Sequence, residues 1–245
     1  MKAMILAAGL GTRLRPLTDH RPKALVTVAG RTMLEIALAR LREAGVTDVI
    51  VNAHHFAEQI DEYLKGREDP GMRIEISREA ELLDTGGGLK HAAWFFQEPG
   101  PDRDASFIVH NVDVISAIDL ARMIRAHSER SALATLAVAA RKSSRQLIFD
   151  EQGNLCGRRA GADALPEIVR PAQQPQELAF SGIHVISPRI FELMQESGAF
   201  SIIDAYLRLA AEGEKIAAFR SDEYYWRDLG KPESIAAAEK DIANG

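Results

Sequence analysis

The chain begins MKAMILAAGLGTRLRPLT (residues 1–18), in which the apolar run Met4 to Ala7 leads directly into a turn that contains Gly9 and Gly11. An apolar run of this kind predicts a buried strand. Glycines after a strand let the backbone approach a ligand closely, and the N–H groups of such a turn can surround an anion. The stretch therefore predicts a phosphate site immediately after the first strand.

Two common phosphate motifs do not match this turn. A P-loop requires GxxxxGK[ST], and a dinucleotide-binding turn requires GxGxxG, whereas Leu14 occupies the place of the third glycine. Arg13 and Arg15 lie just beyond the glycines, and Lys23 precedes an apolar segment. Read separately, these features are a tight turn and solvated surface charges. Read together, they favour a site for a triphosphate.

Segments typical of strands alternate with segments of helical period along the first half of the chain. Strands are expected at 2–7, 48–52 and 72–76, and helices at 33–44 and 56–64. This rhythm predicts an α/β fold, Rossmann-like, with three layers (α/β/α) around a mostly parallel, mixed central sheet. Ligands of such folds bind at the carboxyl ends of the strands, so functional residues should follow strands directly.

The pattern changes in the second half. Strands dominate from Ala132 to Ile186, and the segment 157–177 has no clear period, which predicts a mobile loop over a site. The glycines 86–88 are expected to precede a helix that starts near Leu89. Ser201, followed by Asp204 three residues later, indicates another helix start.

Composition limits the possible partners and compartments. The 245 residues are 46% hydrophobic, enough for one domain over residues 1–245 with at most a small lobe. A net charge of −5 without a Lys/Arg run argues against nucleic-acid binding. The single Cys156 allows no internal disulfide, and neither a leader nor an apolar run of roughly 18 residues is found. We expect no membrane segment and a cytoplasmic protein, while the oligomeric state is not predicted.

The residues Leu6 to Thr18 (LAAGLGTRLRPLT) followed by Pro22 to Leu25 (PKAL) resemble the signature of the sugar-phosphate nucleotidyltransferases, and in particular the small bacterial uridylyltransferases that act on N-acetylmuramate 1-phosphate. In that family the loop wraps a nucleoside triphosphate, and an arginine and a lysine at the positions of Arg13 and Lys23 stabilise its phosphates. The resemblance implies the same fold and extends over nearly the whole chain.

Three later segments follow in the family's order. LDTGGGL (83–89) is similar to the segment that passes under the base, FIVHNVD (107–113) to the strand that ends in a metal-binding aspartate, and WRDLGKP (226–232) to the segment with the second aspartate. Similar enzymes usually have N-G-D where this chain has Asn111-Val112-Asp113, which puts the shape of the sugar pocket in doubt. FSGIH (180–184) is similar to a segment near the sugar, and Arg170 stands where the family often has a lysine that contacts the sugar phosphate.

The resemblance thus implies an Mg²⁺-dependent transfer of a nucleoside monophosphate, UMP from UTP, to a sugar 1-phosphate. The implied catalytic residues are Arg13, Lys23, Asp113 and Asp228, of which Asp113 and Asp228 bind the metal. The implied nucleotide-binding residues are Leu6, Ala8, Gly9, Gly11, Thr12, Arg13, Lys23, Thr85, Gly86 and Gly87. The implied sugar-binding residues are Asn111, Ser181, Gly182 and Arg170.

Several alternatives stay open. A mannose 1-phosphate guanylyltransferase or another sugar 1-phosphate nucleotidyltransferase would have similar motifs, and so would a nucleotide-sugar-binding protein without turnover. Asn52 and His55 follow a strand, and either line the sugar pocket or serve a cap and turn. The histidines show no zinc-ligand spacing, and the G-x-S-x-G turn of Ser/His/Asp hydrolases is absent.

Overall fold

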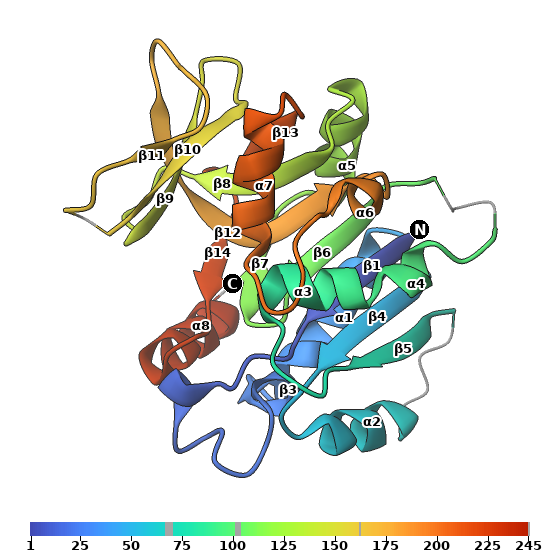
Figure 1. Ribbon diagram of the computed structural model, residues 1–245. Coiled ribbons are helices and arrows are strands. Elements are labelled where there is room, and N and C mark those ends of the chain that lie inside the picture. Colours follow the sequence, from blue (N-terminus) through green and yellow to red (C-terminus); the bar gives the residue numbers. More distant parts are fainter. Residues whose placement is uncertain (67–70, 101–103, 162, 245) are drawn as a thin grey trace.

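Four parallel strands form the part of the central sheet that positions the first loop. A computed structural model describes residues 1–66, 71–100, 104–161 and 163–244. In it, β1 (Lys2–Leu6) pairs with β4 (Asp48–Ala53) and β6 (Phe107–Asn111), and β4 pairs with β5 (Arg73–Arg78), all in parallel. The apolar runs of β1, β4 and β6 are buried on both faces, as is usual when helices cover a parallel sheet on both sides, whereas the edge strand β5 is only partly buried. The carboxyl ends of the four strands therefore meet at one edge (Figure 1).

The sheet becomes mixed beyond β6. The long β12 (Gln176–Ile186) pairs antiparallel with β6, with β8 (Ala134–Ala139) and with β9 (Arg145–Phe149). β10 (Leu155–Ala160) and β11 (Glu167–Ile168) extend the sheet from β9, and β13 (Ile216–Arg220) pairs in parallel with β8. These strands make a ten-stranded sheet with the order β11-β10-β9-β12-β6-β1-β4-β5 and with β8 and β13 off this path.

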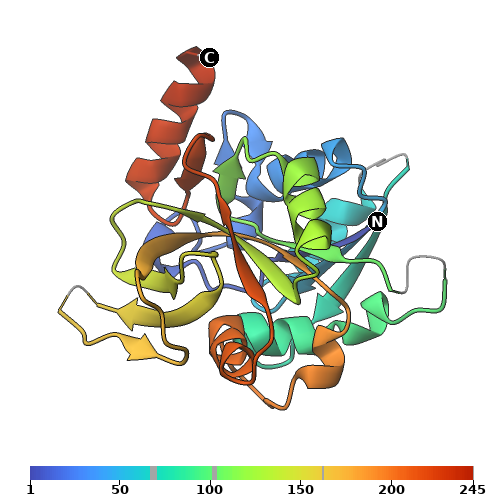
Figure 2. The same ribbon diagram turned by 90° about the horizontal axis from the view of Figure 1, so that it is seen from above.

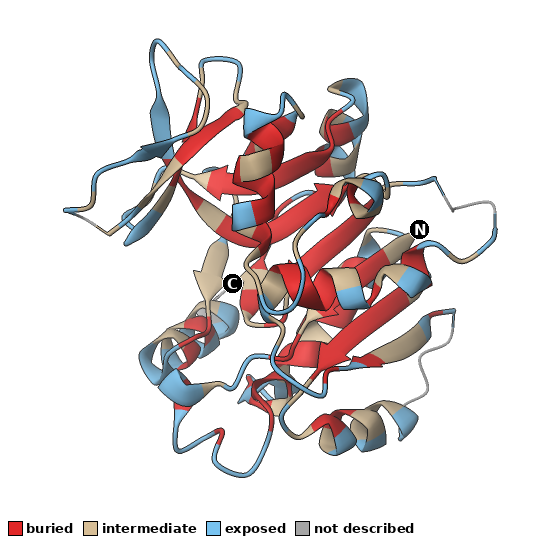
Figure 3. Ribbon diagram, viewed as in Figure 1, coloured by how far each residue is buried: buried red, intermediate tan, exposed pale blue. Residues whose placement is uncertain are grey.

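Two helical layers cover the sheet, and the side-chain alternation of the strands explains why. Ala3 and Ile5 of β1 face the core beneath α1 (Met33–Glu43), α2 (Ala57–Lys65) and α5 (Leu120–Glu129), whereas Met4 faces the opposite core. That opposite face is covered by α3 (Asp84–His91), α4 (Ala93–Phe96), α6 (Ile190–Leu193) and α7 (Ile202–Ala211). Figure 2 shows the two layers on either side of the sheet, and Figure 3 shows the burial of the strands between them. The prediction of a three-layer α/β fold with a mixed, mostly parallel central sheet is confirmed.

Short elements connect this framework to the carboxyl-end edge. The first loop contains the 3-10 turns η1 (Thr12–Leu14) and η2 (Lys23–Leu25), followed by the small hairpin β2 (Thr27–Val28) and β3 (Arg31–Thr32). β7 (Val114–Ser116) pairs antiparallel with β14 (Trp226–Asp228), outside the main sheet. The chain then continues into α8 (Pro232–Asn244).

The prediction of a helix start at Ser201 and the prediction of a loop over residues 157–177 had different outcomes. The helix start at Ser201 is confirmed, because its hydroxyl accepts the Ile203 N–H of α7 at 3.3 Å. The loop predicted over residues 157–177 is wrong in part, since β10 and β11 form there around a cross-strand pair, with Arg158 Nε donating to Glu167 Oε2 at 2.7 Å. Residue 162 lies outside the described residues. Within the described ranges, no helix is long and apolar enough to cross a membrane.

Candidate nucleotide and sugar phosphate site

A cavity of about 380 Å³ opens where β1, β4 and β6 end. It is lined by residues of the first loop, the strand ends and the start of α3, namely Leu6, Ala7, Ala8, Gly9, Lys23, Asn52, Leu82, Asp84, Thr85, Asn111, Val112, Asp113 and Ala199. Seven residues of the predicted site are in this set: Leu6, Ala8, Gly9, Lys23, Thr85, Asn111 and Asp113. The cavity lies at the strand ends where the sequence places a ligand.

The two glycines of the first loop have different uses. Gly11 has a left-handed backbone (φ 66°), and an added Cβ would lie 2.9 Å from the Thr18 methyl and 3.3 Å from Lys23 Cβ. The Thr18 hydroxyl donates to the Gly11 carbonyl at 2.8 Å, so this glycine lets the loop fold tightly against Lys23. Gly9 lines the cavity and has open space around it. Thr12 begins the exposed turn η1, which the buried Leu14 anchors.

Lys23 and Asp113 form an ion pair at the floor of the site. Lys23 begins η2 directly after Pro22, and Asp113 occupies the turn between β6 and β7. The Lys23 ammonium donates to Asp113 Oδ2, and the two side chains are only 10% and 17% exposed. Because the pair is shielded from water, the attraction between these charges is stronger than at the surface.

Asp228 reaches the same place from the far end of the chain. The pairing of β14 with β7 sets Asp228 opposite Val114, and the Leu229 N–H donates to the Asp113 carbonyl oxygen at 2.8 Å. Asp228 Oδ1 accepts the N–H of Gly230 at 2.8 Å. The two predicted metal-binding aspartates are thus adjacent, although more than a hundred residues separate them in sequence.

Gly230 brings Arg13 into this group. A Cβ at Gly230 would lie 2.6 Å from both Asp228 Oδ1 and Arg13 Nη2, so the carboxylate and the guanidinium are within about 5 Å of each other across the glycine. Opposite charges at this distance attract each other in a partly shielded site. The structure therefore gathers Arg13, Lys23, Asp113 and Asp228 around one edge of the sheet.

The glycine triplet differs from its expectation. Gly86 to Gly88 lie inside α3 rather than before it. The N–H groups of Gly86 and Gly87 donate to the Phe200 carbonyl at 2.9 and 3.3 Å, and a Cβ at Gly87 would lie 2.4 Å from the Gly198 carbonyl. These two glycines pack α3 against the segment 198–202, whereas Thr85 lines the cavity and its hydroxyl accepts the N–H of Ile202.

Sequence reasoning missed a buried polar link between two walls of the cavity. Asn52 Oδ1 accepts the Ala7 N–H at 2.7 Å, and Asn52 Nδ2 donates to Glu79 Oε1 at 2.6 Å. Glu79 Oε2 in turn accepts the Leu83 N–H at 3.1 Å. The link ties the first loop to the segment before α3. Asn52 lines the cavity, whereas His55 is exposed and its ring contacts Phe56.

The predicted sugar-side residues are only partly brought together. Gly182 (φ 76°) touches Asn111, since its Cβ would lie 2.9 Å from Asn111 Nδ2. Ser181 is fully buried, and its hydroxyl accepts a hydrogen bond from Arg141 at 3.0 Å. Arg170 follows β11, where its N–H donates to the Cys156 carbonyl at 3.1 Å, and among the described residues it is not part of the cavity lining. A role for Arg170 stays a prediction.

His110 is excluded as a source of positive charge. It is buried in β6, burial lowers its pKa to about 4, and its Nδ1 lies 2.8 Å from the Asn111 carbonyl oxygen. The imidazole is therefore neutral near pH 7. Among the described residues, no three or more His, Cys, Asp or Glu side chains gather in a cluster that could hold a metal ion.

The donor set at this edge suits Mg²⁺. Asp113 and Asp228 supply hard carboxylate oxygens, and the Lys23 ammonium already lies against Asp113, so this carboxylate accepts a cation. Mg²⁺ usually takes one or two protein carboxylates and completes its shell with substrate phosphates and water. Two aspartates without a third acidic ligand therefore fit the ion in the presence of a triphosphate.

Comparisons with known proteins show the family to which the chain belongs. Residues 2–245 match the family model described as nucleotidyl transferase. The N-acetylmuramate alpha-1-phosphate uridylyltransferase of Caulobacter vibrioides is 36% identical over 248 residues, covering 98% of this chain and 96% of that protein. The mannose-1-phosphate guanylyltransferase of Mycobacterium tuberculosis is 28% identical, and the alignment covers 99% of this chain but 65% of that longer protein. The structure of UDP-glucose pyrophosphorylase from Acinetobacter baumannii has a TM-score of 0.80 at 20% identity, covers 98% and 92% of the two chains, and shows the shared fold.

Proposed function

Since the chain belongs to the nucleotidyl transferase family and is a sugar 1-phosphate nucleotidyltransferase, we propose that it transfers UMP from UTP to N-acetylmuramate 1-phosphate in an Mg²⁺-dependent reaction. The observation that carries the reaction type is the convergence of Arg13, Lys23, Asp113 and Asp228 beside the cavity at the strand ends. The choice of uracil and of the acceptor is supported by the 36% identity to the Caulobacter enzyme over nearly its full length.

The reaction needs no general base. An oxygen of the sugar phosphate attacks the α-phosphorus of UTP, the new P–O bond forms, and the bond from the α-phosphorus to the bridging oxygen of pyrophosphate breaks. The attacking phosphate has a second pKa of about 6, so it is mostly ionised at neutral pH. His110 is buried in β6 and is not among the described residues that line the cavity, so the proposed mechanism depends on charge and alignment.

The four charged side chains have different proposed roles toward the departing pyrophosphate and toward the reacting phosphates. Lys23 and Arg13 hold the β- and γ-phosphates and the departing pyrophosphate, while Gly9 leaves space for the triphosphate beside the loop. Lys23 is paired with Asp113, so a bound triphosphate would compete with this carboxylate for the ammonium. Mg²⁺ held by Asp113 and Asp228 supplies positive charge for the reacting phosphates when it is bound.

The residues proposed for the acceptor lie at the end of β6 and in β12. Asn111 lines the cavity and contacts Gly182, so the ends of β6 and the middle of β12 meet there. We assign Asn111, Gly182 and the backbone beside Ser181 to the sugar. The hydroxyl of Ser181 accepts a hydrogen bond from Arg141. We therefore assign the main chain of this segment, rather than the Ser181 hydroxyl, to contacts with the sugar.

A pyrophosphate-release assay tests the proposal. UTP, GTP, dTTP and ATP are each combined with N-acetylmuramate, glucose or mannose 1-phosphate, with Mg²⁺ or with EDTA. We expect release with UTP and N-acetylmuramate 1-phosphate, and loss of release in EDTA. Preference for GTP with mannose 1-phosphate would assign a guanylyltransferase instead. Binding of a nucleotide sugar without pyrophosphate release in any combination would indicate a non-catalytic binding protein.

A further inference from the structure

β12 leaves its regular pairing with β8 beside the proposed sugar site. Phe180 is paired with Val138, but the next paired residue is His184, opposite Leu136, so β12 contains a bulge over Phe180–His184. Bulges re-aim side chains and backbone near functional sites, and they leave backbone groups without their ladder partners. The β12 bulge includes the buried Ser181 and the left-handed Gly182 that touches Asn111.

Arg141, just after β8, supplies hydrogen bonds to this bulge. Its Nη1 donates to the Ala179 carbonyl at 3.2 Å and to the Ser181 hydroxyl at 3.0 Å, and its Nη2 donates to the Phe180 carbonyl. A guanidinium presents several donors in one plane, which suits a row of carbonyl oxygens. The Arg141 side chain therefore contacts one oxygen from each of three consecutive residues, Ala179 to Ser181, at the start of the bulge.

The same guanidinium stacks on the strand that leads to Asp228. The Arg141 guanidinium carbon lies 3.7 Å from the centre of the Trp226 ring, and Trp226 Nε1 donates to the Ser181 carbonyl at 2.8 Å. Trp226 is two residues before Asp228 on β14. Burial lowers the pKa of Arg141, and the nearby Asp228 and Asp222 carboxylates oppose that shift. The guanidinium thus contacts both the β12 bulge, through hydrogen bonds, and β14, through the Trp226 ring.

We propose that Arg141 is a positioning residue: stacked on Trp226 and bonded to the β12 bulge, it fixes the acceptor side of the site relative to Asp228. The assignment of the bulge to the acceptor rests on the proposed function. Lysine cannot replace Arg141 in this role, because an ammonium has neither the planar face that stacks on Trp226 nor the fork of donors.

Arg141→Lys tests the proposal kinetically, with Arg122→Lys as the matched control. Arg122 also lies over an aromatic ring, 5.9 Å from the centre of Phe219, and donates to Glu223, but it is on the exposed side of α5. The acceptor is the sugar 1-phosphate that the wild-type protein uses in the assay above. We expect Arg141→Lys to raise the acceptor KM about tenfold and to leave the UTP KM within about twofold, while Arg122→Lys changes neither. Equal rises in both KM values, or no rise, would overturn the proposal.

A second measurement needs no turnover. The chain has two tryptophans, and replacing the exposed Trp94 by Phe leaves Trp226 as the only fluorophore of this type. In the ligand-free protein, Arg141→Lys should shift Trp226 emission to longer wavelength and increase its quenching by acrylamide, whereas Arg122→Lys should not. Unchanged emission contradicts the proposed contact. If Arg141→Lys shows these fluorescence effects but the wild-type protein releases no pyrophosphate, the proposed function alone is contradicted.

Discussion

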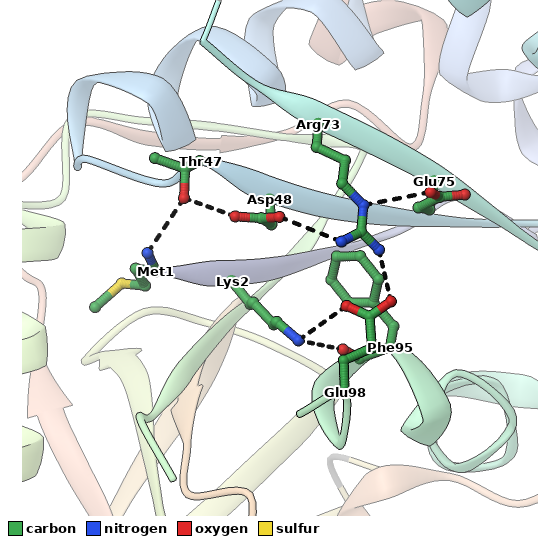
Figure 4. Close-up of polar contacts among 8 residues, drawn as sticks. All are labelled: Met1, Lys2, Thr47, Asp48, Arg73, Glu75, Phe95 and Glu98. Carbon is green, nitrogen blue, oxygen red and sulfur yellow. Dashed lines mark hydrogen bonds and ion pairs between the residues drawn. The ribbon is translucent and has the colours of Figure 1, made fainter. Parts of the chain in front are cut away.

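The two edges of the parallel strands hold their charges in opposite ways. At the amino-end edge, Lys2 of β1 donates to Glu98 at 3.2 Å, and Arg73 of β5 donates to Glu98 at 2.6 Å and lies 3.7 Å from Asp48 of β4 (Figure 4). Both cations also lie over the Phe95 ring. Lys2 and Arg73 thus each lie against a carboxylate of the protein itself, and these contacts link β1, β4 and β5 to the segment after α4.

At the carboxyl-end edge the charges are close but incompletely matched. Lys23 is bonded to Asp113, whereas Arg13 and Asp228 approach each other across Gly230 without forming an ion pair of 4 Å or less among the described contacts. Arg13 is exposed in the first loop, the same loop in which Gly9 has open space around it. The contrast leads us to expect that similar residues at opposite ends of the same strands serve stability at the amino-end edge and, under the proposed function, substrate binding at the carboxyl-end edge. It predicts which substitutions affect turnover and which affect only stability.

The largest effect is expected for Asp113→Asn. Removing one preorganised charge from a phosphoryl-transfer site typically costs about 3 kcal/mol in the barrier, or about a hundredfold or more in rate. The variant also leaves the Lys23 ammonium, only 10% exposed, without its carboxylate, which should cost about 1–3 kcal/mol of stability. Pyrophosphate release and the thermal midpoint measure the two losses.

Asp48→Asn is the control for this variant at the opposite edge. Asp48 lies at the start of β4, whereas Asp113 lies just after the end of β6. The Asp48 carboxylate is 3.7 Å from Arg73. We expect its rate to stay within about twofold of wild type. A rate for Asp113→Asn equal to that of Asp48→Asn would remove Asp113 from the proposed site.

An intermediate effect is expected for Gly230→Ala. The added methyl would occupy the position that lies 2.6 Å from both Arg13 Nη2 and Asp228 Oδ1, so these groups must move apart. Arg13 is long and exposed and shifts easily, so stability should change little, whereas misplaced charges should lower kcat about tenfold or more. Gly100→Ala is the control, because a Cβ there meets no atom within 4 Å. Equal kcat values for the two variants would show that the spacing at Gly230 does not matter for turnover.

The sequence predicted the parallel half of the sheet better than the antiparallel half. Continuous apolar runs such as Met4 to Ala7 indicate strands by themselves, and Asp113 follows β6 as expected. The β12 bulge depends on contacts of Arg141 and Trp226 with distant backbone, and a single-residue pattern cannot show them. β10 was missed because its outward residues are arginines that pair across strands.

Within the candidate site, the sequence indicated the positions of the two aspartates better than the position of the glycine triplet. The adjacency of Asp113 and Asp228 agrees with the resemblance, because it follows from topology, here the pairing of β7 with β14. Gly86 and Gly87 look like a ligand-binding turn, but their small size serves the contact of α3 with the segment 198–202. Glu79 gives a weak signal in sequence, since a glutamate after a strand is usually solvated, and its burial is set by Asn52 of the neighbouring strand.

The smallest effect is expected for Glu98→Gln at the amino-end edge. Hydrogen bonds from Arg73 and then Lys2 hold the pKa of Glu98 below its ordinary value of 4.5. A carboxyl whose pKa is lower in the folded state contributes stability above its unfolded pKa and loses it as the pH falls through the folded value. Because the pair is partly solvated, the contribution at pH 7 should be less than about 1 kcal/mol. Thermal midpoints should therefore separate wild type from Glu98→Gln slightly at pH 7 and converge as the pH falls through the lowered pKa of Glu98, with kcat unchanged. A substantial loss of kcat in Glu98→Gln would show that the two edges are not independent.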